Sequence, residues 1–465
     1  MSSSKMRVFR LVTALSAASA MAAIAFIPTW TFVDPSVKAR KTTVSTVTLV
    51  CEVAPHARAA ELTVVAQGAG KNAIQIAGFP RPSLWKVSGE QRFSLKVSPR
   101  TQFVSLHVDQ SAVNTAQAVM TTRDVSRLNR GVASQSCAPT TTQWWFAGAA
   151  GTLGRDDVLV LSNPERTATV VNVEFITDHG IMTPAAAQGV VVPATGQRSI
   201  RINNLVPGRS AVAVHVTTTG GRIHAGVFVR ASYGRFPVGS EWLTATSTDG
   251  TIVPFVGDTP KLSMVFAAPE GAASVKILAL GRSGQFAPAG LPAFAVAAGH
   301  ARVVKIPDVS VNASALLISS TAPVVAGYAG GVSIQRPQSV QDVATASAVV
   351  PSKSDQTLAI GTYPRGRVAV IAAGPNAGAS GVLIVATNGT VQRVPYAVPP
   401  GGSERIQLTR SASNVYIHAS PDNGSGAYVL FVATRGVTGN ARDAAGVTAS
   451  VRSSSVVLRA VVQVP

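Results

Sequence analysis

The chain has 465 residues, of which 46% are hydrophobic and 13% charged, and its formal net charge is +19. These values exclude a disordered chain, which would combine few apolar residues with many charges. They also exclude a polytopic membrane protein, because one apolar stretch alone is long enough to span a bilayer.

The N-terminus combines basic residues with that apolar stretch. Three Lys and Arg residues within the first ten precede an uncharged stretch at 11–33. A helix of this length crosses a hydrocarbon core of ~30 Å, and its basic flank stays in the cytoplasm. We therefore expect residues 1–35 to be a cytoplasmic tail and a transmembrane or signal segment, with the bulk of a single-pass protein outside. The alternative is secretion after cleavage at Ala-Ile-Ala (23–25), but apolar residues continue past that site.

Beyond residue 35, apolar residues come in short runs rich in Val and Ala. Gly, Pro, Asn, Ser and Thr separate these runs. This texture is typical of many short strands joined by turns. Because single domains usually have ~100–150 residues, the length predicts several β-rich domains.

Cys51 and Cys137 are the only cysteines. In an exported chain, a sparse and even number of cysteines indicates a structural disulfide. The alternative is a pair of buried free thiols, and two distant cysteines supply too few ligands for a metal site. We predict a disulfide whose Cα atoms lie within ~7 Å of each other.

Comparison of the chain with itself indicates four copies of one β-module. Each copy has a strand, a Gly-containing turn, further strands and a closing hairpin. Glycines of the equivalent turn recur every 104 to 110 residues, at Gly70, Gly180, Gly284 and Gly389. The predicted modules are 43–137, 142–245, 251–345 and 355–465.

The predicted fold is all-β, with tandem immunoglobulin-like β-sandwich modules after one N-terminal helix. Six or seven short strands in ~100 residues are typical of such sandwiches. At 199–202 and 404–408 apolar residues occupy every second position, which predicts one buried and one solvated face. The alternative is a β-propeller, but the chain has no tryptophan–aspartate or glycine–histidine blade signature, and its repeat is twice as long as a usual blade.

The positive charge bears on the choice of partner. Outside the membrane, the available polyanions are wall polymers and lipid headgroups, so we expect anionic wall polymers or other envelope proteins as partners and no nucleic acid. The alternative is a solvated surface without a partner, because the arginines form no dense run. Arg198, Arg201, Arg302 and Arg405 fall in or beside equivalent strands, and period-two alternation predicts an outward orientation for Arg201 and Arg405.

A search for catalytic and ligand motifs finds no Gly-x-Ser-x-Gly, His-Glu-x-x-His or Cys-x-x-Cys sequence. We therefore predict no enzymatic activity, no catalytic residue, no cofactor and no metal site. Asp156-Asp157 and Glu241 could each supply half of a carboxylate pair for glycoside chemistry, but no partner is identifiable. Three histidines at equivalent strand positions are best explained as half-buried strand residues: His107, His215 and His418.

Trp144 and Trp145 are candidate ligand-stacking residues. Together with Phe146 they form an aromatic cluster that offers flat apolar surfaces to a sugar ring. The equivalent stretch of the next module, 264–267, is also apolar. This equivalence favours the alternative that the cluster fills the space between modules.

One resemblance rests on specific residues. The sequence Cys-Ala-Pro is followed by Trp-Trp-Phe-Ala-Gly within 137–148, and 158–164 reads Val-Leu-Val-Leu-Ser-Asn-Pro. These features resemble the actinobacterial exported family catalogued as domain of unknown function 5719, although Ala149 replaces an expected glycine. The resemblance implies an envelope location and no activity.

Together these inferences predict a non-enzymatic cell-envelope protein. It would be a membrane-tethered scaffold of β-modules that binds wall polymers or proteins. The alternative is a carbohydrate-active enzyme, or its accessory subunit, at the cell wall.

Overall fold

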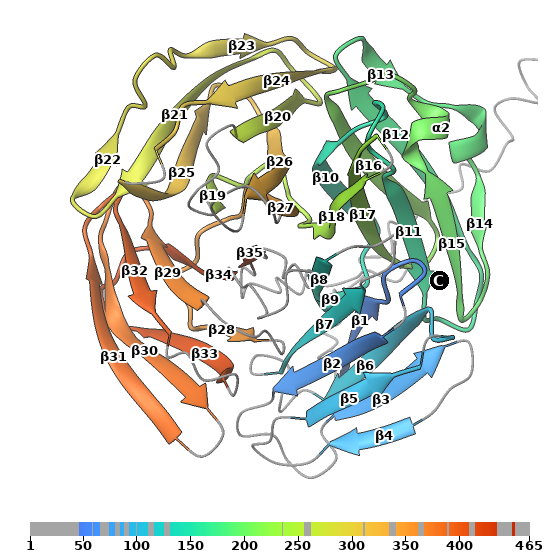
Figure 1. The fold of residues 1–465 in the computed structure, drawn as a ribbon, viewed down its shortest axis with the longest axis horizontal. Coiled ribbons are helices and arrows are strands. Elements are labelled where there is room, and N and C mark those ends of the chain that lie inside the picture. The colour runs from blue at the N-terminus through green and yellow to red at the C-terminus, as the bar shows by residue number, and fades with distance from the viewer. Residues whose placement is uncertain are drawn as a thin grey trace, which may run out of the picture. The chain divides into compact units, whose positions relative to one another are not determined.

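A computed structural model describes most of the chain between residues 46 and 451 (Figure 1). The described residues are 46–57, 59–65, 74–79, 84–87, 93–98, 100–109, 116–124, 131–234, 236–254, 262–309, 312–333, 341–360, 367–387, 390–408, 414–434 and 449–451. The predicted N-terminal helix lies outside these ranges. Among the helices within them, none is long and apolar enough to cross a membrane.

The regular elements of the described residues are nearly all β-strands, and the strands fall into four segments. The first segment contains β1 (Thr46–Glu52), β2 (Ala59–Val65), β3 (Ile74–Phe79), β4 (Leu84–Val87), β5 (Phe93–Val97), β6 (Phe103–Asp109), β7 (Gln117–Asp124), β8 (Gly131–Ser136) and β9 (Ala138–Pro139). The second contains β10 (Gln143–Ala149), β11 (Val158–Asn163), β12 (Thr169–Thr177), β13 (Gly180–Met182), η2 (Ala185–Ala187), β14 (Val190–Val192), β15 (Gly196–Arg201), α2 (Ile202–Leu205), β16 (Val212–Thr219), β17 (His224–Tyr233) and β18 (Phe236–Leu243).

The other two segments repeat this sequence of strands. The third contains β19 (Ile252–Pro254), β20 (Leu262–Ala268), β21 (Ala273–Gly281), β22 (Gly284–Phe286), β23 (Phe294–Val296), β24 (His300–Ile306), β25 (Ala313–Ser320), β26 (Val325–Ser333) and β27 (Gln341–Ser347). The fourth contains β28 (Gln356–Ala359), β29 (Arg367–Ala373), β30 (Ala379–Thr387), β31 (Thr390–Val398), β32 (Ser403–Gln407), β33 (Asn414–Pro421), β34 (Tyr428–Thr434) and β35 (Ala449–Val451).

Each segment forms two small antiparallel sheets with a recurring strand order. From the first segment to the fourth, one sheet has the strand order β4-β3-β6-β1-β9, β13-β12-β16-β10, β22-β21-β25-β19 and β31-β30-β33-β28. The other runs β5-β2-β7-β8, β15-β11-β17-β18, β24-β20-β26-β27 and β32-β29-β34-β35. The chain thus crosses repeatedly between two sheets, and it does so in the same order four times.

Turn chemistry explains the recurring hairpins. Thr177 pairs with Gly180 and Gly281 pairs with Gly284, so two residues lie between the paired ends of each hairpin, at the predicted turn positions. The φ angles of Gly180 and Gly284 are 103° and 124°, in the region that only glycine adopts without strain. The turn at 388–389 and Gly70 lie outside the described residues.

The two sheets of each segment enclose one apolar cluster. In the third segment, Phe266 and Tyr328 of one sheet pack with Ile277 and Ile318 of the other. Corresponding clusters lie between the paired sheets of the remaining segments. The cluster of the first segment also takes in Val158, Val160, Phe228 and Trp242 of the second, so these cores are continuous across segment boundaries.

The predicted solvated face holds only for some strands. In β32, Ile406 is buried and Arg405 and Gln407 are exposed, as predicted. In the other stretch, β15 ends at Arg201, and the buried Ile202 begins the short helix α2. All six residues of β11 are buried, because its second face packs against the first segment.

Candidate functional site

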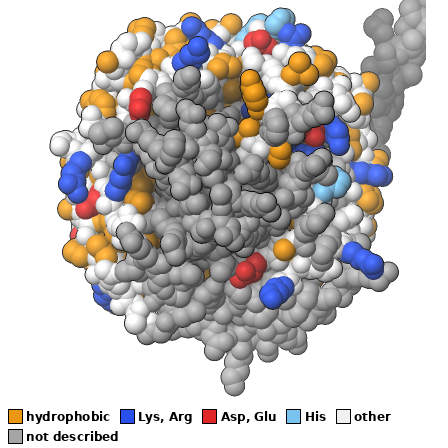
Figure 2. All heavy atoms as spheres, in the orientation of Figure 1, with side chains coloured by type: hydrophobic (Ala, Val, Ile, Leu, Met, Phe, Trp, Pro, Cys, Tyr) orange, Lys and Arg blue, Asp and Glu red, His pale blue; other side chains and the backbone are white. Residues whose placement is uncertain are grey.

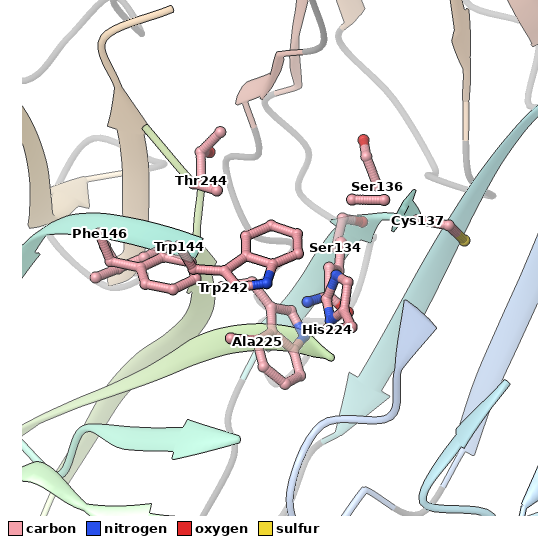
Figure 3. Close-up of a pocket in the computed structure, with 13 residues that line it drawn as sticks. Ser134, Ser136, Cys137, Trp144, Phe146, His224, Ala225, Trp242 and Thr244 are labelled. Carbon is pink, nitrogen blue, oxygen red and sulfur yellow. The ribbon is translucent and has the colours of Figure 1, made fainter. Parts of the chain in front are cut away.

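Strands of the first and second segments border a recess at their junction. Its volume is about 120 Å³, and it lies among the ends of β8, β10, β17 and β18 (Figure 3). The recess is lined by Ser134, Gln135, Ser136, Cys137, Ala138, Trp144, Phe146, His224, Ala225, Trp242, Leu243, Thr244 and Ala245. The walls of the recess thus include both aromatic rings and polar groups.

Period-two alternation in β10 brings Trp144 and Phe146 to the recess. Their rings stack with centroids 6.2 Å apart, and the Trp144 and His224 rings meet in an edge-to-face arrangement with centroids 4.8 Å apart. The Trp144 Nε1 donates to the carbonyl of Ile223 at 3.1 Å, which fixes the indole. Trp242, from β18, packs on Phe228 at 5.0 Å. Figure 3 shows the two tryptophans beside His224 and Ser134.

A buried polar network lies next to the recess. Glu52 ends β1 with no exposed surface and accepts bonds from Ser162 Oγ at 3.0 Å and Gln135 Nε2 at 3.1 Å. The His224 Nδ1 lies 3.1 Å from Glu52 Oε1. Because Glu52 and Gln135 belong to the first segment and Ser162 and His224 to the second, this network crosses the junction. A buried carboxylate needs such partners.

Gly226 allows the two segments to approach each other here. A Cβ atom at this position of β17 would collide with Glu52 Oε2 and would lie 2.8 Å from Gln135 Nε2 and 2.9 Å from Trp242 Cζ3. The missing side chain therefore makes room for the carboxylate.

The predicted disulfide is confirmed and lies beside the recess. Cys51 and Cys137 are bonded, with Cα atoms 4.5 Å apart, and both are fully buried. Cys137 lines the recess, and Cys51 precedes Glu52. The bond thus ties β1 to the chain that follows β8.

The structure separates the two predicted stacking residues onto opposite faces of β10. Trp145 stacks on His215 of β16, with centroids 3.7 Å apart, and joins an apolar cluster with the third segment. Burial lowers the pKa of His215, although Glu174 at 3.2 Å opposes this shift. Of the predicted pair, Trp144 alone lines the recess, and a ligand role for it stays a prediction.

The acidic residues weighed for glycoside chemistry are engaged in the fold. Asp157 is fully buried and accepts from Arg155 Nη2 at 2.7 Å and Ala150 N at 2.8 Å, and burial raises its pKa despite the arginine. Asp156 pairs with Arg230. Glu241 accepts from the backbone N–H groups of Ser134 and Trp242.

The other two equivalent histidines also contact neighbouring strands. His107 Nδ1 lies 3.0 Å from the Thr48 hydroxyl, and His418 Nδ1 lies 2.8 Å from the Thr357 hydroxyl. Burial lowers the pKa of His418, and Asp355 at 3.5 Å opposes this. Within the described ranges, no group of three His, Cys, Asp or Glu side chains is placed to hold a metal ion.

Arg201 and Arg405, which were predicted to face outward, are exposed, and so are the two other arginines of this group, Arg198 and Arg302. Three of them bond carbonyl oxygens: Arg198 that of Val191, Arg302 that of Ala295, and Arg405 that of Ala313 in the third segment. Among the described side chains on the face shown in Figure 2, Lys and Arg are scattered and form no single patch.

A family model of a family of unknown function, DUF5719, matches residues 96–409, which is more than half of the chain. The chain belongs to this family. None of the curated proteins compared with it matches. All residues that line the recess of this DUF5719 protein lie within the matched span, whereas Glu52 precedes it.

Glu52, His224 and the cavity role of Trp242 were not predicted from the sequence. The one local signal for Glu52 is a charge within the apolar run 47–54. His224 follows a turn and has no sequence pattern that marks it. Only the packing of two segments brings these residues together.

Proposed function

We propose that this protein is a non-enzymatic scaffold of the actinobacterial cell envelope that binds wall polymers or other envelope proteins. The predicted segment 1–35 would anchor it in the cytoplasmic membrane as a single-pass protein, with the bulk outside. The alternative for the anchor is cleavage and secretion. The disulfide supports export, because such bonds persist in oxidising compartments and are rare in the cytosol.

The packing between segments is the observation that carries the scaffold role. Trp145 and Ala213 of the second segment cluster with Val265 and Val325 of the third. Phe431 of the fourth segment joins a similar cluster with Leu317 of the third. Large apolar contacts between neighbouring parts of a chain oppose relative motion, which suits a rigid support.

We interpret each pair of sheets as an immunoglobulin-like sandwich, since one core lies between its sheets. The β-propeller remains the alternative, and burial on both faces of strands such as β11 favours it. Expression of residues 251–345 alone separates the two interpretations. A sandwich module is expected to unfold cooperatively by itself, whereas a piece of a propeller would lose its side contacts and fail to fold.

Binding to the envelope tests the proposed function. The purified full chain is mixed with isolated walls, and photo-crosslinking in living cells identifies what it touches. We expect saturable binding without release of soluble sugar. Absence of both wall binding and envelope crosslinks would contradict the proposal.

A carbohydrate-active enzyme, or its accessory subunit, is the second candidate. It is favoured by the recess, where Trp144 and Trp242 lie close to the Glu52–His224 pair. Turnover of wall glycan by the full chain that is abolished in Glu52→Gln would establish this candidate instead of the scaffold.

A further inference from the structure

We propose that the recess binds the acetamido group of an N-acetylated amino sugar in a wall glycan. This inference rests on the proposed wall-binding function and names the group that is recognised. The walls of the recess combine the two kinds of surface that an acetamido group requires, aromatic faces and polar groups.

The size of the recess fits a small group and excludes a whole sugar. A volume of about 120 Å³ is close to that of cavities that hold one benzene molecule, at ~150 Å³. Pockets that enclose complete drug-sized ligands have ~300–1,000 Å³. A substituent of a few atoms can therefore enter, while the ring that carries it stays outside.

The residues that line the recess become more exposed from its floor to its rim, as insertion of a small substituent requires. Trp144, Phe146, Ala225 and Trp242 are buried and form the floor. Residues with intermediate exposure form the rim: Gln135, Ser136, Ala138, Thr244 and Ala245. The group that enters is thus surrounded by aromatic surface, and the sugar ring lies against a polar edge.

The chemistry of the walls matches a methyl group beside an amide. The tryptophan and phenylalanine rings offer apolar surface to the methyl group. The Trp242 Nε1 is buried and has no hydrogen-bond partner among the described residues, and an unpaired buried donor costs roughly 1–3 kcal/mol. A carbonyl oxygen is the acceptor that such a donor lacks. The Glu52 carboxylate already accepts bonds from Ser162 and Gln135 and lies 3.1 Å from His224 Nδ1, so the recess favours a neutral ligand over a charged one.

The experiment uses the full chain and neutral oligosaccharides of equal length that differ at one substituent. Isothermal titration compares oligomers of N-acetylglucosamine with oligomers of glucose, which carry a hydroxyl in place of the acetamido group. An acetyl-lysine peptide tests the other source of the same amide chemistry. Binding to isolated walls is measured in parallel for every variant.

Three variants probe the site. Trp242→Phe keeps an aromatic ring and removes the N–H donor, so it should weaken binding of the acetylated sugar about fivefold. Ala225→Val fills the floor with two methyl groups and should weaken binding at least about tenfold. Trp145→Phe is the matched control, because its side chain lies on the opposite face of β10, and it should leave binding unchanged.

The outcomes separate this inference from the proposed function. Preference for the acetylated sugar that Ala225→Val removes, in a variant that unfolds at the same temperature as the parent chain, supports the inference. Equal binding of both sugars, preference for the acetyl-lysine peptide, or equal effects of the Trp145 and Trp242 variants overturns it. If wall binding persists in those cases, the proposed function stands without the recess, whereas loss of all wall binding contradicts both.

Discussion

The junction between the first and second segments differs in chemistry from that between the third and fourth. The first junction holds the buried Glu52 network, Gly226 and the recess. The other is mainly an apolar cluster, with Phe431 packed near Leu317 and Ile252. Its polar contacts are uncharged acceptors: Ser403 donates to the carbonyl of Leu280, and Arg405 donates to Ser314 Oγ and the carbonyl of Ala313.

The two junctions therefore join similar segments through different kinds of interaction. Apolar contacts hold segments together without directional requirements, since their stabilisation scales with buried area. A buried polar network costs desolvation and stabilises only when all its members are paired. The polar junction therefore contains buried groups that are not needed simply to hold the segments together.

Removal of the carboxylate at the polar junction is expected to have the largest effect. Glu52→Ala leaves Ser162, Gln135 and His224 without their buried partner. Each unsatisfied group costs roughly 1–3 kcal/mol, so the free energy of unfolding should fall by about 5 kcal/mol. Urea denaturation measures this change. Glu165→Ala, at an exposed position, is the control and should change stability by less than about 0.5 kcal/mol.

Loss of the disulfide should be the next largest effect. The double variant Cys51→Ala and Cys137→Ala opens a loop closed over a separation of 86 residues. The chain-entropy model predicts a loss of about 4.5 kcal/mol. Thermal unfolding of the parent chain with and without reductant should reproduce the difference. Equal unfolding temperatures under both conditions would show that the bond contributes nothing.

Truncation at the apolar junction should cost less and leave the recess intact. Phe431 is fully buried, and Phe431→Ala removes transfer energy and leaves a cavity, for a loss of about 3 kcal/mol. Val391→Ala, at a position that is 62% exposed, is the control. Because the two junctions lie in different parts of the chain, the sugar affinity proposed for the recess should not change. A parallel loss of affinity would mean that the junctions are coupled.

The pH dependence should be the smallest effect and should arise away from the recess. Burial lowers the pKa of His215 and His418 below 6.5, so the folded chain favours their neutral forms. These histidines then take up protons at a higher pH in the unfolded chain than in the folded chain. The free energy of unfolding therefore falls as the pH drops below about 6.5. In the double variant His215→Gln and His418→Gln, the decrease between pH 7.5 and 5.5 should be shallower. Identical slopes would assign the decrease to other groups.

Local sequence patterns predicted turns and strands well where a single residue type determines the backbone conformation. The turns before Gly180 and Gly284 follow from glycine's freedom at positive φ, and the alternation around Ile406 follows from the strand period. The disulfide followed from counting cysteines. The resemblance to the family rested on contiguous motifs at 137–148 and 158–164, and both lie within the matched residues 96–409.

The sequence by itself determined that this chain is β-rich, repeated four times and crosslinked once, because turn residues, periodicity and cysteine number act over short distances or need no geometry. Tertiary structure decided which faces are buried and what meets at the junctions. The run Val158–Leu161 is apolar at every position, and only packing shows that its second face covers the first segment's core. Glu52 and His224 are far apart in the chain and meet because Gly226 lets two sheets approach, a contact that no local pattern encodes.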